Sequence, residues 1–568
     1  MTGHTAHGTT APATTAFDNS ASANSASANS VSVPTTALSA ARRAGELAEL
    51  RDRDTPVDLV VIGGGITGAG IALDAASRGL ETVLLEAHDL AFGTSRWSSK
   101  LAHGGLRYLA TGNIGIARRS AVERGIMLER TAPHLVRPLA QVVPVFRDTP
   151  PLGAVLPGLG FLAGTVLSRL AGTRADRLPG ARILSAGKVA RYVPGVRRRG
   201  LEFGHLNWDC QLIDDARLVT AVARTAAGHG ARVITRARVL EATGTRVTVR
   251  DEFGGGGGES SDDDEFTISA RAVVSATGVW AGQTTPGVRV RPSRGTHLVV
   301  RAAALGDPVG ALTVPVPGET NRFCFALPAE FGRLHVGLTD VDAPGPVPDV
   351  PEATEDEIDF LLDVVNRALE TGLTREDVLG TFAGLRPLVD SGDGNTADLS
   401  REHAVLTSDN GLITITGGKL TEYRLMAEQA VDLVVGRTGV AAGPCRTADL
   451  PLIGAPGHPE VARPTPVSGG GRLPASLVAR YGQEAAAVVS ESLLDRPLEK
   501  VADGLDVTRA EFSYAVTHEG ALTVGDILDR RSRIGLVHTD RAAAEPTARE
   551  ALAASPGSAT PPPDPLPL

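Results

Sequence analysis

Three glycines near the start of the chain have the spacing of a turn that holds a dinucleotide. Gly63, Gly65 and Gly68 follow the apolar run Val57–Ile62, which is typical of a buried strand, and a helix-like run follows at once. The first glycine permits a tight turn, the second lets the backbone approach a pyrophosphate, and the third lets the helix pack on the strand. The N-terminus of that helix then faces the phosphate charge.

An acidic residue completes this pattern. The second strand, ETVLLE, ends at Glu86, whose carboxylate can accept hydrogen bonds from a ribose hydroxyl. A glycine-rich turn alone does not explain this acid, so the pattern predicts a dinucleotide site, although it does not distinguish NAD from FAD. A similar string from Gly158 to Ala163 lacks the following strand and acid, and we predict no second site there.

Lysine is rare in this chain, which directs attention to the lysines that are present. Of 56 basic residues only Lys100, Lys188, Lys419 and Lys500 are lysines. Two of them lie in the glycine-rich strings SSKLAHGGLRY and TGGKLTEYR, where a compact ammonium group fits better than a planar guanidinium. Chance retention is the alternative explanation.

The same strings, together with AGLRPLVD, gather further polar groups. These groups are Arg107, Tyr108, Arg386, Thr421 and Arg424. Converging cations near a cofactor suit an anionic substrate, particularly a phosphate, whereas solvated surface cations are the alternative. His297 opens the apolar strand in RGTHLVV and is the histidine that we single out as a candidate base, with a structural role as its alternative.

Composition limits the classes of protein to which the chain can belong. Its 568 residues contain 42% hydrophobic and 21% charged residues, which is enough apolar material for a large core. The net charge of −9 argues against nucleic acid as a partner. Cys210, Cys324 and Cys445 form no C-x-x-C pair, so we expect neither a disulfide framework nor a metal site, and a reducing cytosol fits best. The first residues do not resemble a secretory signal.

Low-complexity segments mark the expected boundaries of the ordered protein. Residues 1–36 repeat Ala, Ser, Thr and Asn and are predicted to be a disordered arm, and a short charged helix follows from Leu38. Gly254–Glu265 is expected to be a mobile hairpin tip. Residues 454–472 form a linker to a helical C-terminal domain at 473–545, and a disordered tail is predicted at 546–568.

The longest uncharged run, Thr149–Ser168, is nearly as long as a membrane span. Three prolines and four glycines interrupt it, which disfavours a spanning helix. Its apolar side chains still need a cover, which is either a membrane surface or the core of the protein itself. Arg169, Arg174 and Arg177 follow the run and suit contact with anionic lipid.

Taken together, several strings resemble the FAD-dependent glycerol-3-phosphate dehydrogenases. They are DLVVIGGGITGAGIALDAASRGL, SRWSSKLAHGGLRYL, APHL, DDARLV, ATGVWA, GLRPL and GGKLTEYR, and the likeness runs from about residue 40 to about residue 540. The resemblance implies an α/β fold with a glutathione-reductase-like FAD-binding Rossmann domain, an antiparallel-sheet substrate domain and a helical C-terminal domain. Implied boundaries are 50–130 with 200–290 and 400–437 for the discontinuous FAD domain, and 131–199 with 291–399 for the substrate domain.

The resemblance also implies the residues of the site. The implied FAD contacts are Gly63, Gly64, Gly65, Gly68, Glu86, Ser98, Ser99, Lys100, His103, Gly104, Gly278, Gly417, Gly418, Leu420 and Thr421. Implied substrate contacts are Arg107, Tyr108, Arg401 and Lys419, with His297 and Arg386 as catalytic residues. A secondary alcohol loses hydride only if its hydroxyl proton leaves with it, so a base within about 3 Å of that oxygen is required.

The implied reaction is oxidation of sn-glycerol 3-phosphate to dihydroxyacetone phosphate, with electrons passed from FAD to a membrane quinone. The implied location is the cytoplasm, with peripheral attachment to the inner face of the cell membrane, and a homodimer is among the predicted partners. Two alternatives stay open: an FAD-dependent oxidase of a hydroxy acid, amine or glycerol phosphate that uses oxygen, and a flavin-binding interaction protein.

Overall fold

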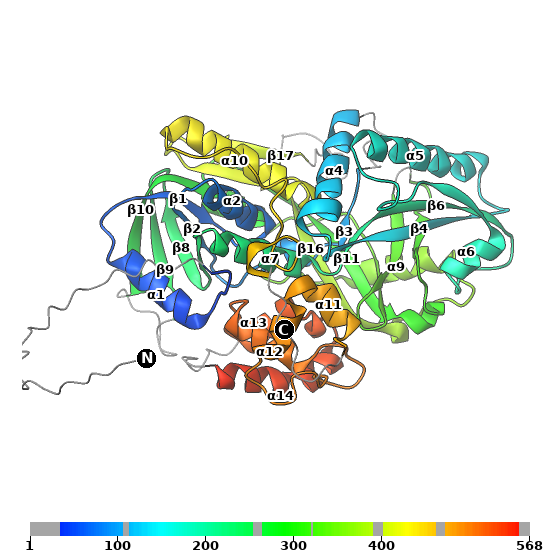
Figure 1. Cartoon of the computed structure of the whole chain (residues 1–568). Coiled ribbons are helices and arrows are strands. Elements are labelled where there is room, and N and C mark those ends of the chain that lie inside the picture. Colours follow the sequence, from blue (N-terminus) through cyan, green and yellow to red (C-terminus); the bar gives the residue numbers. More distant parts are fainter. Residues whose placement is uncertain are drawn as a thin grey trace, which may run out of the picture. The chain divides into compact units, whose positions relative to one another are not determined.

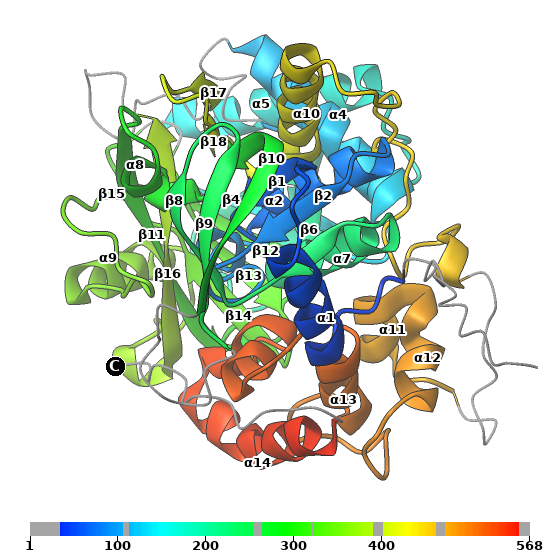
Figure 2. The ribbon, with the colours of Figure 1, turned by 90° about the vertical axis from the view of Figure 1, so that its left-hand side faces the viewer.

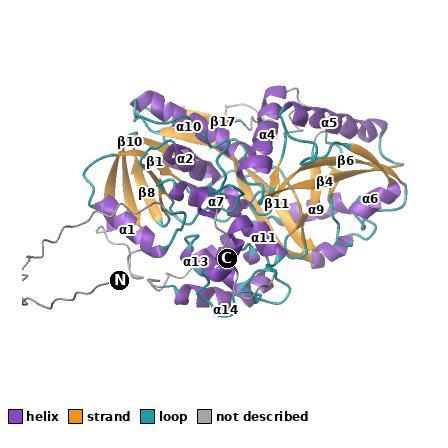
Figure 3. Cartoon of the chain, viewed as in Figure 1, coloured by secondary structure: helices purple, strands orange, loops and turns teal. Residues whose placement is uncertain are grey.

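The computed structural model of the protein describes residues 35–105, 113–253, 264–319, 322–389, 402–461 and 472–555. These residues form two β-sheets with helices packed against them and a group of C-terminal helices (Figure 1, Figure 3).

The first sheet is built around the strand that precedes the glycine-rich turn. Its strands run in the order β17 (His403–Thr407), β18 (Ile413–Gly417), β10 (Glu265–Ser275), β1 (Val57–Ile62), β2 (Thr82–Leu85) and β7 (Arg232–Ile234). β1 pairs in parallel with β10 on one side and with β2 on the other. Because a central parallel strand is covered on both faces, β1 is almost continuously apolar.

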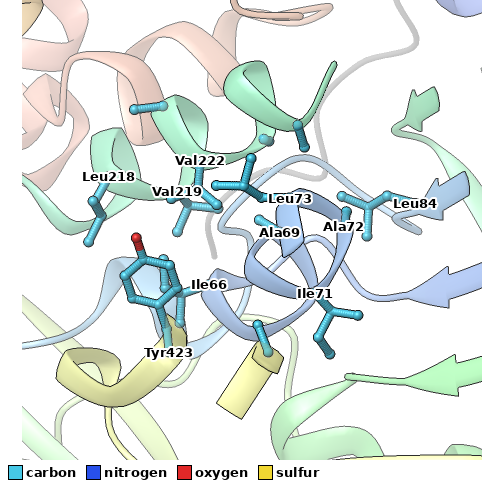
Figure 4. Packing of buried hydrophobic residues seen from close by; sticks show 14 of the residues in the cluster. Ile66, Ala69, Ile71, Ala72, Leu73, Leu84, Leu218, Val219, Val222 and Tyr423 are labelled. Atoms are coloured by element: carbon cyan, nitrogen blue, oxygen red, sulfur yellow. The ribbon is translucent and has the colours of Figure 1, made fainter. Parts of the chain in front are cut away.

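Both faces of this sheet are covered. On one face, α2 (Ile66–Ser77) contacts α7 (Asp215–Gly228) and α10 (Tyr423–Thr438). Figure 4 shows Leu73 of α2 next to Val222 of α7, and Leu84 of β2 next to Ala72. The other face packs on α1 (Ala40–Arg51) and on the hairpin of β8 (Ala237–Ala242) and β9 (Arg246–Asp251). α1 agrees with the helix predicted there and begins where the Ser39 hydroxyl accepts a hydrogen bond from the Arg42 amide.

The second sheet carries His297 on its long strand β11 (Val290–Arg301), which pairs antiparallel with β16 (Val378–Val389) and β14 (Arg333–Gly337). The order continues through β13 (Phe323–Ala329), β12 (Ala311–Pro315), β4 (Val136–Phe146), β6 (Leu201–Leu212) and β3 (Leu101–Ala102). β15 (Val341–Asp342) pairs with β11, and β5 (Arg182–Ser185) pairs with β6. α6 (Ala186–Tyr192) and α9 (Glu355–Asn366) pack against this sheet.

Strand β6 departs from the expected domain division. Residues from 200 onward were assigned to the FAD domain, but β6 pairs with β4 along its length in the second sheet. The chain returns to the first sheet only at α7, where the Asp214 carboxylate caps the helix by accepting from the Arg217 amide. The long alternation of side chains in β6 does not reveal which sheet a strand joins.

The prediction that prolines and glycines interrupt residues 149–168 is wrong. Residues Pro151–Leu170 form one helix, α5. Pro151 lies in the first helical turn, where a backbone N–H would have no partner within the helix, so its absence costs nothing there. The helix also continues through Pro157. Gly158 is needed for packing, because a Cβ there would lie 2.6 Å from His205 Cε1.

The C-terminal helices are α11 (Ala475–Tyr481), α12 (Ala485–Ser490), α13 (Arg509–Thr517) and α14 (His538–Ala554). α11 and α13 lie near α7, with Tyr481 bonded to Arg217 and Tyr514 bonded to Arg224, whereas α14 lies farther from α7 in both views (Figure 1, Figure 2). α14 extends well past the predicted boundary at residue 545, because Ala548, Ala551 and Leu552 are buried against its neighbours. The predicted boundary at residue 545 is therefore too early, and residues 556–568 of the predicted tail lie outside the described residues.

The predicted N-terminal arm also ends too late. Thr36 is buried, its amide donates to Glu460 Oε1 at 3.0 Å, and its carbonyl accepts from Arg224. Residues 1–34 and 254–263 of the predicted arm and hairpin tip lie outside the described residues. The strands that flank that tip do form a hairpin, in which Val249 pairs antiparallel with Phe266.

Candidate active site

In the glycine-rich turn between β1 and α2, the backbone packs directly against other backbone atoms, without room for side chains. Gly63 has a φ of +107°, and a Cβ on it would lie 2.6 Å from the carbonyl oxygen of Ala276. A Cβ on Gly68 would lie 1.9 Å from the carbonyl oxygen of Gly63. Gly65 caps α2, and the nearest atom to a Cβ there is the Ser95 hydroxyl at 3.1 Å. The turn thus presents backbone and a helix N-terminus to the adjacent cavity.

Glu86 lies where the pattern places it, at the end of β2 and beside the turn. Its Oε2 accepts from the Gly64 amide at 2.6 Å, and its Oε1 accepts from the His88 amide at 2.8 Å. Burial raises the pKa of this carboxyl, while these two amides act in the opposite direction. Two backbone donors therefore fix the carboxylate at the cavity wall, where a ribose hydroxyl would approach.

A cavity of about 1010 Å³ runs from this turn to the second sheet. Its wall includes the predicted residues Gly63, Gly65, Glu86, Ser98, Ser99, His103, Gly278, His297, Arg386, Gly417, Gly418, Lys419, Leu420 and Thr421. Gly278, Gly417 and Gly418 have φ values of +57°, +80° and +77°, so the backbone forms much of the wall. The size, the glycine cradle at one end and the polar groups at the other fit a flavin dinucleotide.

The segment Ser98–Lys100 links the two sheets at the centre of the cavity. The backbone amide of Ser98 donates to Asp215 Oδ2 at 2.9 Å, and its hydroxyl donates to the same oxygen at 2.7 Å. Ser99 points the other way, and its hydroxyl is hydrogen-bonded to His297 Nε2 at 2.9 Å. This segment therefore joins the acid at the start of α7 to the histidine of β11.

Lys100 does not reach this cavity, in contrast to the expectation that it lines the flavin. Its Nζ lies 3.0 Å from Asp215 Oδ1, and the side chain is buried. Burial lowers the pKa of Lys100 against the attraction of Asp215, while Lys100 and Arg533 hold the pKa of Asp215 below its ordinary value despite burial. Gly104 has a packing role as well, because a Cβ there would lie 2.2 Å from Arg124.

His297 is held as a neutral ring. It is 1% exposed and stacks on Phe382 with ring centroids 4.6 Å apart. Burial, together with the charges of Lys100 and Arg386, lowers the pKa of His297 to about 3. A neutral imidazole can accept a proton, as a base in this position must.

Two cations face the cavity in fixed positions. Arg386 donates to the Thr339 carbonyl at 3.0 Å and lies 3.2 Å from Asp340 Oδ1. Lys419 Nζ donates to the Ser120 hydroxyl at 3.0 Å and lies 3.2 Å from Glu422 Oε1. Each cation is thus oriented by an acidic partner, Asp340 for Arg386 and the nearby Glu422 for Lys419, which prepares it to meet an anionic group.

Some predicted residues cannot be placed, and others were missed. Arg107, Tyr108 and Arg401 lie outside the described residues. Asp215 and Asp340 were assigned no role, although Asp215 lies in the DDARLV string on which the resemblance rests. Only the contacts with Ser98 and Arg386 reveal what these acids do.

Comparison with known proteins assigns the chain to the class of protein that the geometry of the site indicates. Residues 58–424 match the family of FAD dependent oxidoreductases, and residues 445–554 match the C-terminal domain of alpha-glycerophosphate oxidase. The fold and the site therefore define an FAD-dependent oxidoreductase, and the predicted fold class and cofactor are confirmed.

Individual relatives narrow the class. Glycerol-3-phosphate dehydrogenase 1 of Mycobacterium tuberculosis is 56% identical over 522 residues, covering 91% of this chain and 99% of that protein. The aerobic glycerol-3-phosphate dehydrogenase of Staphylococcus aureus is 34% identical over 430 residues, covering 74% of each. The structure of the Bacillus halodurans glycerol-3-phosphate dehydrogenase complexed with FAD matches with a TM-score of 0.67 and 27% identity, covering 92% of this chain and 95% of that one. The chain belongs to the FAD-dependent glycerol-3-phosphate dehydrogenase family.

Proposed function

We propose that this protein oxidises sn-glycerol 3-phosphate to dihydroxyacetone phosphate. The observation that carries the proposal is one continuous cavity in which a dinucleotide cradle meets His297, Arg386 and Lys419. The family relationship supports the choice of substrate, because relatives named glycerol-3-phosphate dehydrogenases align with most of the chain. FAD, when bound, supplies the acceptor for the hydride that leaves C2 of the substrate.

His297 accepts the proton of the substrate hydroxyl through Ser99, whose hydroxyl passes its own proton to Nε2 as it takes the proton of the substrate. Ser99 fixes the direction of that nitrogen, and stacking on Phe382 fixes the plane of the ring. Lys100 and Arg386 make the imidazolium unfavourable in the absence of substrate. A phosphate dianion adds negative charge to the cavity and therefore raises the proton affinity of the ring when substrate is present.

Lys419 and Arg386 orient the substrate. An ammonium and a guanidinium on the wall of one cavity can meet the phosphate and the developing negative charge on the substrate oxygen. Because Glu422 and Asp340 already hold these cations, little ordering remains to be done when the substrate binds. Fixed cations favour a dianionic phosphoryl alcohol over a neutral polyol of the same size.

Anaerobic reduction of the flavin tests this function directly. The holoenzyme is mixed with sn-glycerol 3-phosphate, its 1-phosphate enantiomer, glycerol or a small hydroxy acid, and the loss of flavin absorbance is followed. Only sn-glycerol 3-phosphate should bleach the flavin rapidly, and His297→Ala should bleach slowly with FAD still bound. Rapid bleaching by a hydroxy acid or an amino acid, with none by glycerol 3-phosphate, would contradict the proposal.

We propose a membrane quinone as the electron acceptor and the inner face of the cell membrane as the location. Among the described residues, α5 is long and apolar enough to span a membrane by length and composition, and only 17% of its most apolar stretch is buried in the protein. Val155, Leu159, Leu162 and Val166 form one stripe on this helix and are 52–59% exposed. The neighbouring side of α5, including Leu156 and Phe161, lines the cavity, and Leu159 of the stripe also lies on the cavity wall.

This arrangement suits a helix that lies in the membrane interface. The exposed stripe can enter the headgroup layer, while Arg169 and Arg174 at the end of the helix can meet anionic lipid. A quinone dissolved in that membrane would then lie close to the cavity, because residues of α5 line the cavity wall. The reoxidation of the bleached flavin by a short-chain quinone, compared with oxygen, tests the acceptor and separates the dehydrogenase from an oxidase.

Sedimentation with anionic liposomes tests the membrane contact. The substitutions Val155→Ser, Leu162→Ser and Val166→Ser remove exposed side chains that do not line the cavity, so the flavin spectrum should persist while the protein leaves the lipid pellet. A matched triple variant, Val309→Ser, Leu493→Ser and Leu498→Ser, removes exposed apolar side chains elsewhere and should still sediment. Equal sedimentation of both variants would rule out α5 as the anchor.

A homodimer is the remaining predicted partner. Light scattering after gel filtration of the detergent-solubilised holoenzyme measures its mass, and a mass of one chain would contradict this prediction.

A further inference from the structure

Arginines of one short segment in the C-terminal domain bind Asp89 and Arg96, which are adjacent in the chain to residues of the cavity wall. Residues Asp526–Arg531 form a π-helical turn, and Arg533 follows with a left-handed φ of +62°. Arg530 and Arg531 both bind Asp89, which lies three residues after Glu86. A non-glycine residue in the left-handed region is uncommon and is retained where surrounding contacts hold it.

Arg533 contacts the segment Arg96–Lys100, which contains Ser99, the hydrogen-bond partner of His297. Its Nη2 donates to the carbonyl oxygen of Arg96 at 2.7 Å, and its Nε lies 3.3 Å from Asp214 Oδ2. The guanidinium also lies over the ring of Trp97, 5.0 Å from the centroid. The side chain is 5% exposed, so these contacts are made within the protein interior.

A continuous set of contacts leads from Arg533 to His297. Arg96 and Trp97 immediately precede Ser98, whose amide and hydroxyl are held by Asp215. Lys100 Nζ returns to the same Arg96 carbonyl at 3.1 Å and pairs with Asp215. Ser99, between these two anchored residues, presents its hydroxyl to His297.

We propose that Arg533 is a positioning residue of the active site: it holds the Arg96–Lys100 segment from the C-terminal side, and through that segment it fixes the Ser99 hydroxyl against His297. The inference rests on the proposed function only for the proton-accepting role of His297. The C-terminal domain is then part of the catalytic unit, because Arg533 holds this segment together with Asp215 and with the Leu212 amide, which donates to the Lys100 carbonyl.

The geometry explains why an arginine in this backbone conformation is needed. Its fork must meet the Arg96 carbonyl and Asp214 at the same time while its plane covers Trp97, which a lysine cannot do. Buried charges that hold one another in this way tolerate little displacement. A loss of alignment of about 1 Å at the catalytic groups can slow a reaction about a hundredfold.

The test uses the FAD-bound enzyme and the variant Arg533→Gly. Glycine adopts a positive φ without strain, so this variant removes the side chain while keeping the backbone. Arg533→Lys keeps the charge and one donor, and Arg509→Ala is the matched control. Arg509 is a buried arginine of the same domain. It binds Glu550 and the Asp495 carbonyl, and neither of these partners belongs to the Arg96–Lys100 segment.

Two readouts are measured. Hydrogen exchange at the amides of residues 97–101 needs no substrate and should accelerate at least tenfold in Arg533→Gly. The rate of anaerobic flavin reduction at saturating glycerol 3-phosphate should fall about tenfold to a hundredfold. The half-saturating concentration should change less than about twofold, because Lys419 and Arg386 are untouched. Arg533→Lys should give intermediate values.

The outcomes separate the two proposals. Unchanged exchange and an unchanged reduction rate in Arg533→Gly would overturn the positioning role, and so would equal changes in Arg509→Ala, since these would indicate general loosening of the domain. If glycerol 3-phosphate does not reduce the wild-type flavin, the proposed function fails. Faster exchange confined to the Arg533 variants would in that case still support the structural link.

Discussion

Replacement of Gly68 by alanine should weaken FAD binding through a single backbone collision. The new Cβ would lie 1.9 Å from the carbonyl oxygen of Gly63. Real Cβ contacts are essentially never shorter than 3.0 Å, so α2 and the turn must separate by about 1.1 Å. Neither side can yield by rotating a side chain, because both atoms belong to the backbone or are attached to it directly.

The size of the effect follows from that displacement. Overpacking of this kind costs about 1–3 kcal/mol of stability. Moving the start of α2 also withdraws backbone amides from the pyrophosphate, and a hydrogen bond to a charged group contributes about 1.5–3 kcal/mol. Loss of one such bond corresponds to an FAD dissociation constant raised about tenfold to a hundredfold.

Flavin release measures this change. Wild-type, Gly68→Ala and Gly45→Ala proteins are diluted to submicromolar concentration, and free FAD is quantified by its fluorescence after rapid filtration. Gly45 lies on α1 with no atom within 4 Å of a new Cβ, so its variant should keep FAD and unfold at a slightly higher temperature. A folded Gly68→Ala protein that retains FAD like the wild type would refute the reasoning.

Three further predictions concern the cradle, the cations and acid stability. Gly65→Val should abolish stoichiometric flavin absorbance in the purified, folded protein, because a branched side chain would occupy the space in which backbone meets pyrophosphate. Asp340→Ala should lower kcat/KM for glycerol 3-phosphate about tenfold or more by releasing Arg386, and an unchanged kcat/KM would contradict that role. The melting temperature should fall as pH decreases from about 6.5 towards 4: burial lowers the pKa of His134 to about 4 and that of His297 to about 3, so the unfolded chain binds protons that the folded chain does not. A melting temperature that is constant or rises over this range would contradict this prediction.

Local features of the site could be predicted from the sequence. The turn at Gly63 and Gly68 and the acid at Glu86 are recognisable because strand, glycine spacing and helix lie within one short stretch of chain. The backbone contacts that exclude a Cβ at these glycines are made inside that same unit or with the adjacent strand β10. The strings around Ser99 and Gly418 were identified by resemblance, since nothing in their composition states what they bind.

Prolines and glycines disfavour a continuous helix over Thr149–Ser168, whereas the structure has one over Pro151–Leu170. Proline and glycine are unfavourable in an isolated helix, but Gly158 allows close packing on His205, and the ring of His205 donates to the Ala154 carbonyl at 2.7 Å. Tertiary contacts of this kind override local preference. Sequence did indicate correctly that the run is apolar, and only the structure shows that one side of it faces the cavity and the other is exposed.

Local sequence patterns therefore predict the dinucleotide turn and, through motif resemblance, the family and a part of the cavity wall. Tertiary structure alone decided which groups orient those residues: Asp215 for Ser98, Asp340 for Arg386 and Arg533 for the segment before Ser99. These partners are separated by tens to hundreds of residues along the chain. Charged side chains of this kind have no periodicity that identifies them, and their role depends on which other charge the fold buries beside them, because a buried charge is stable only when it is paired and hydrogen-bonded.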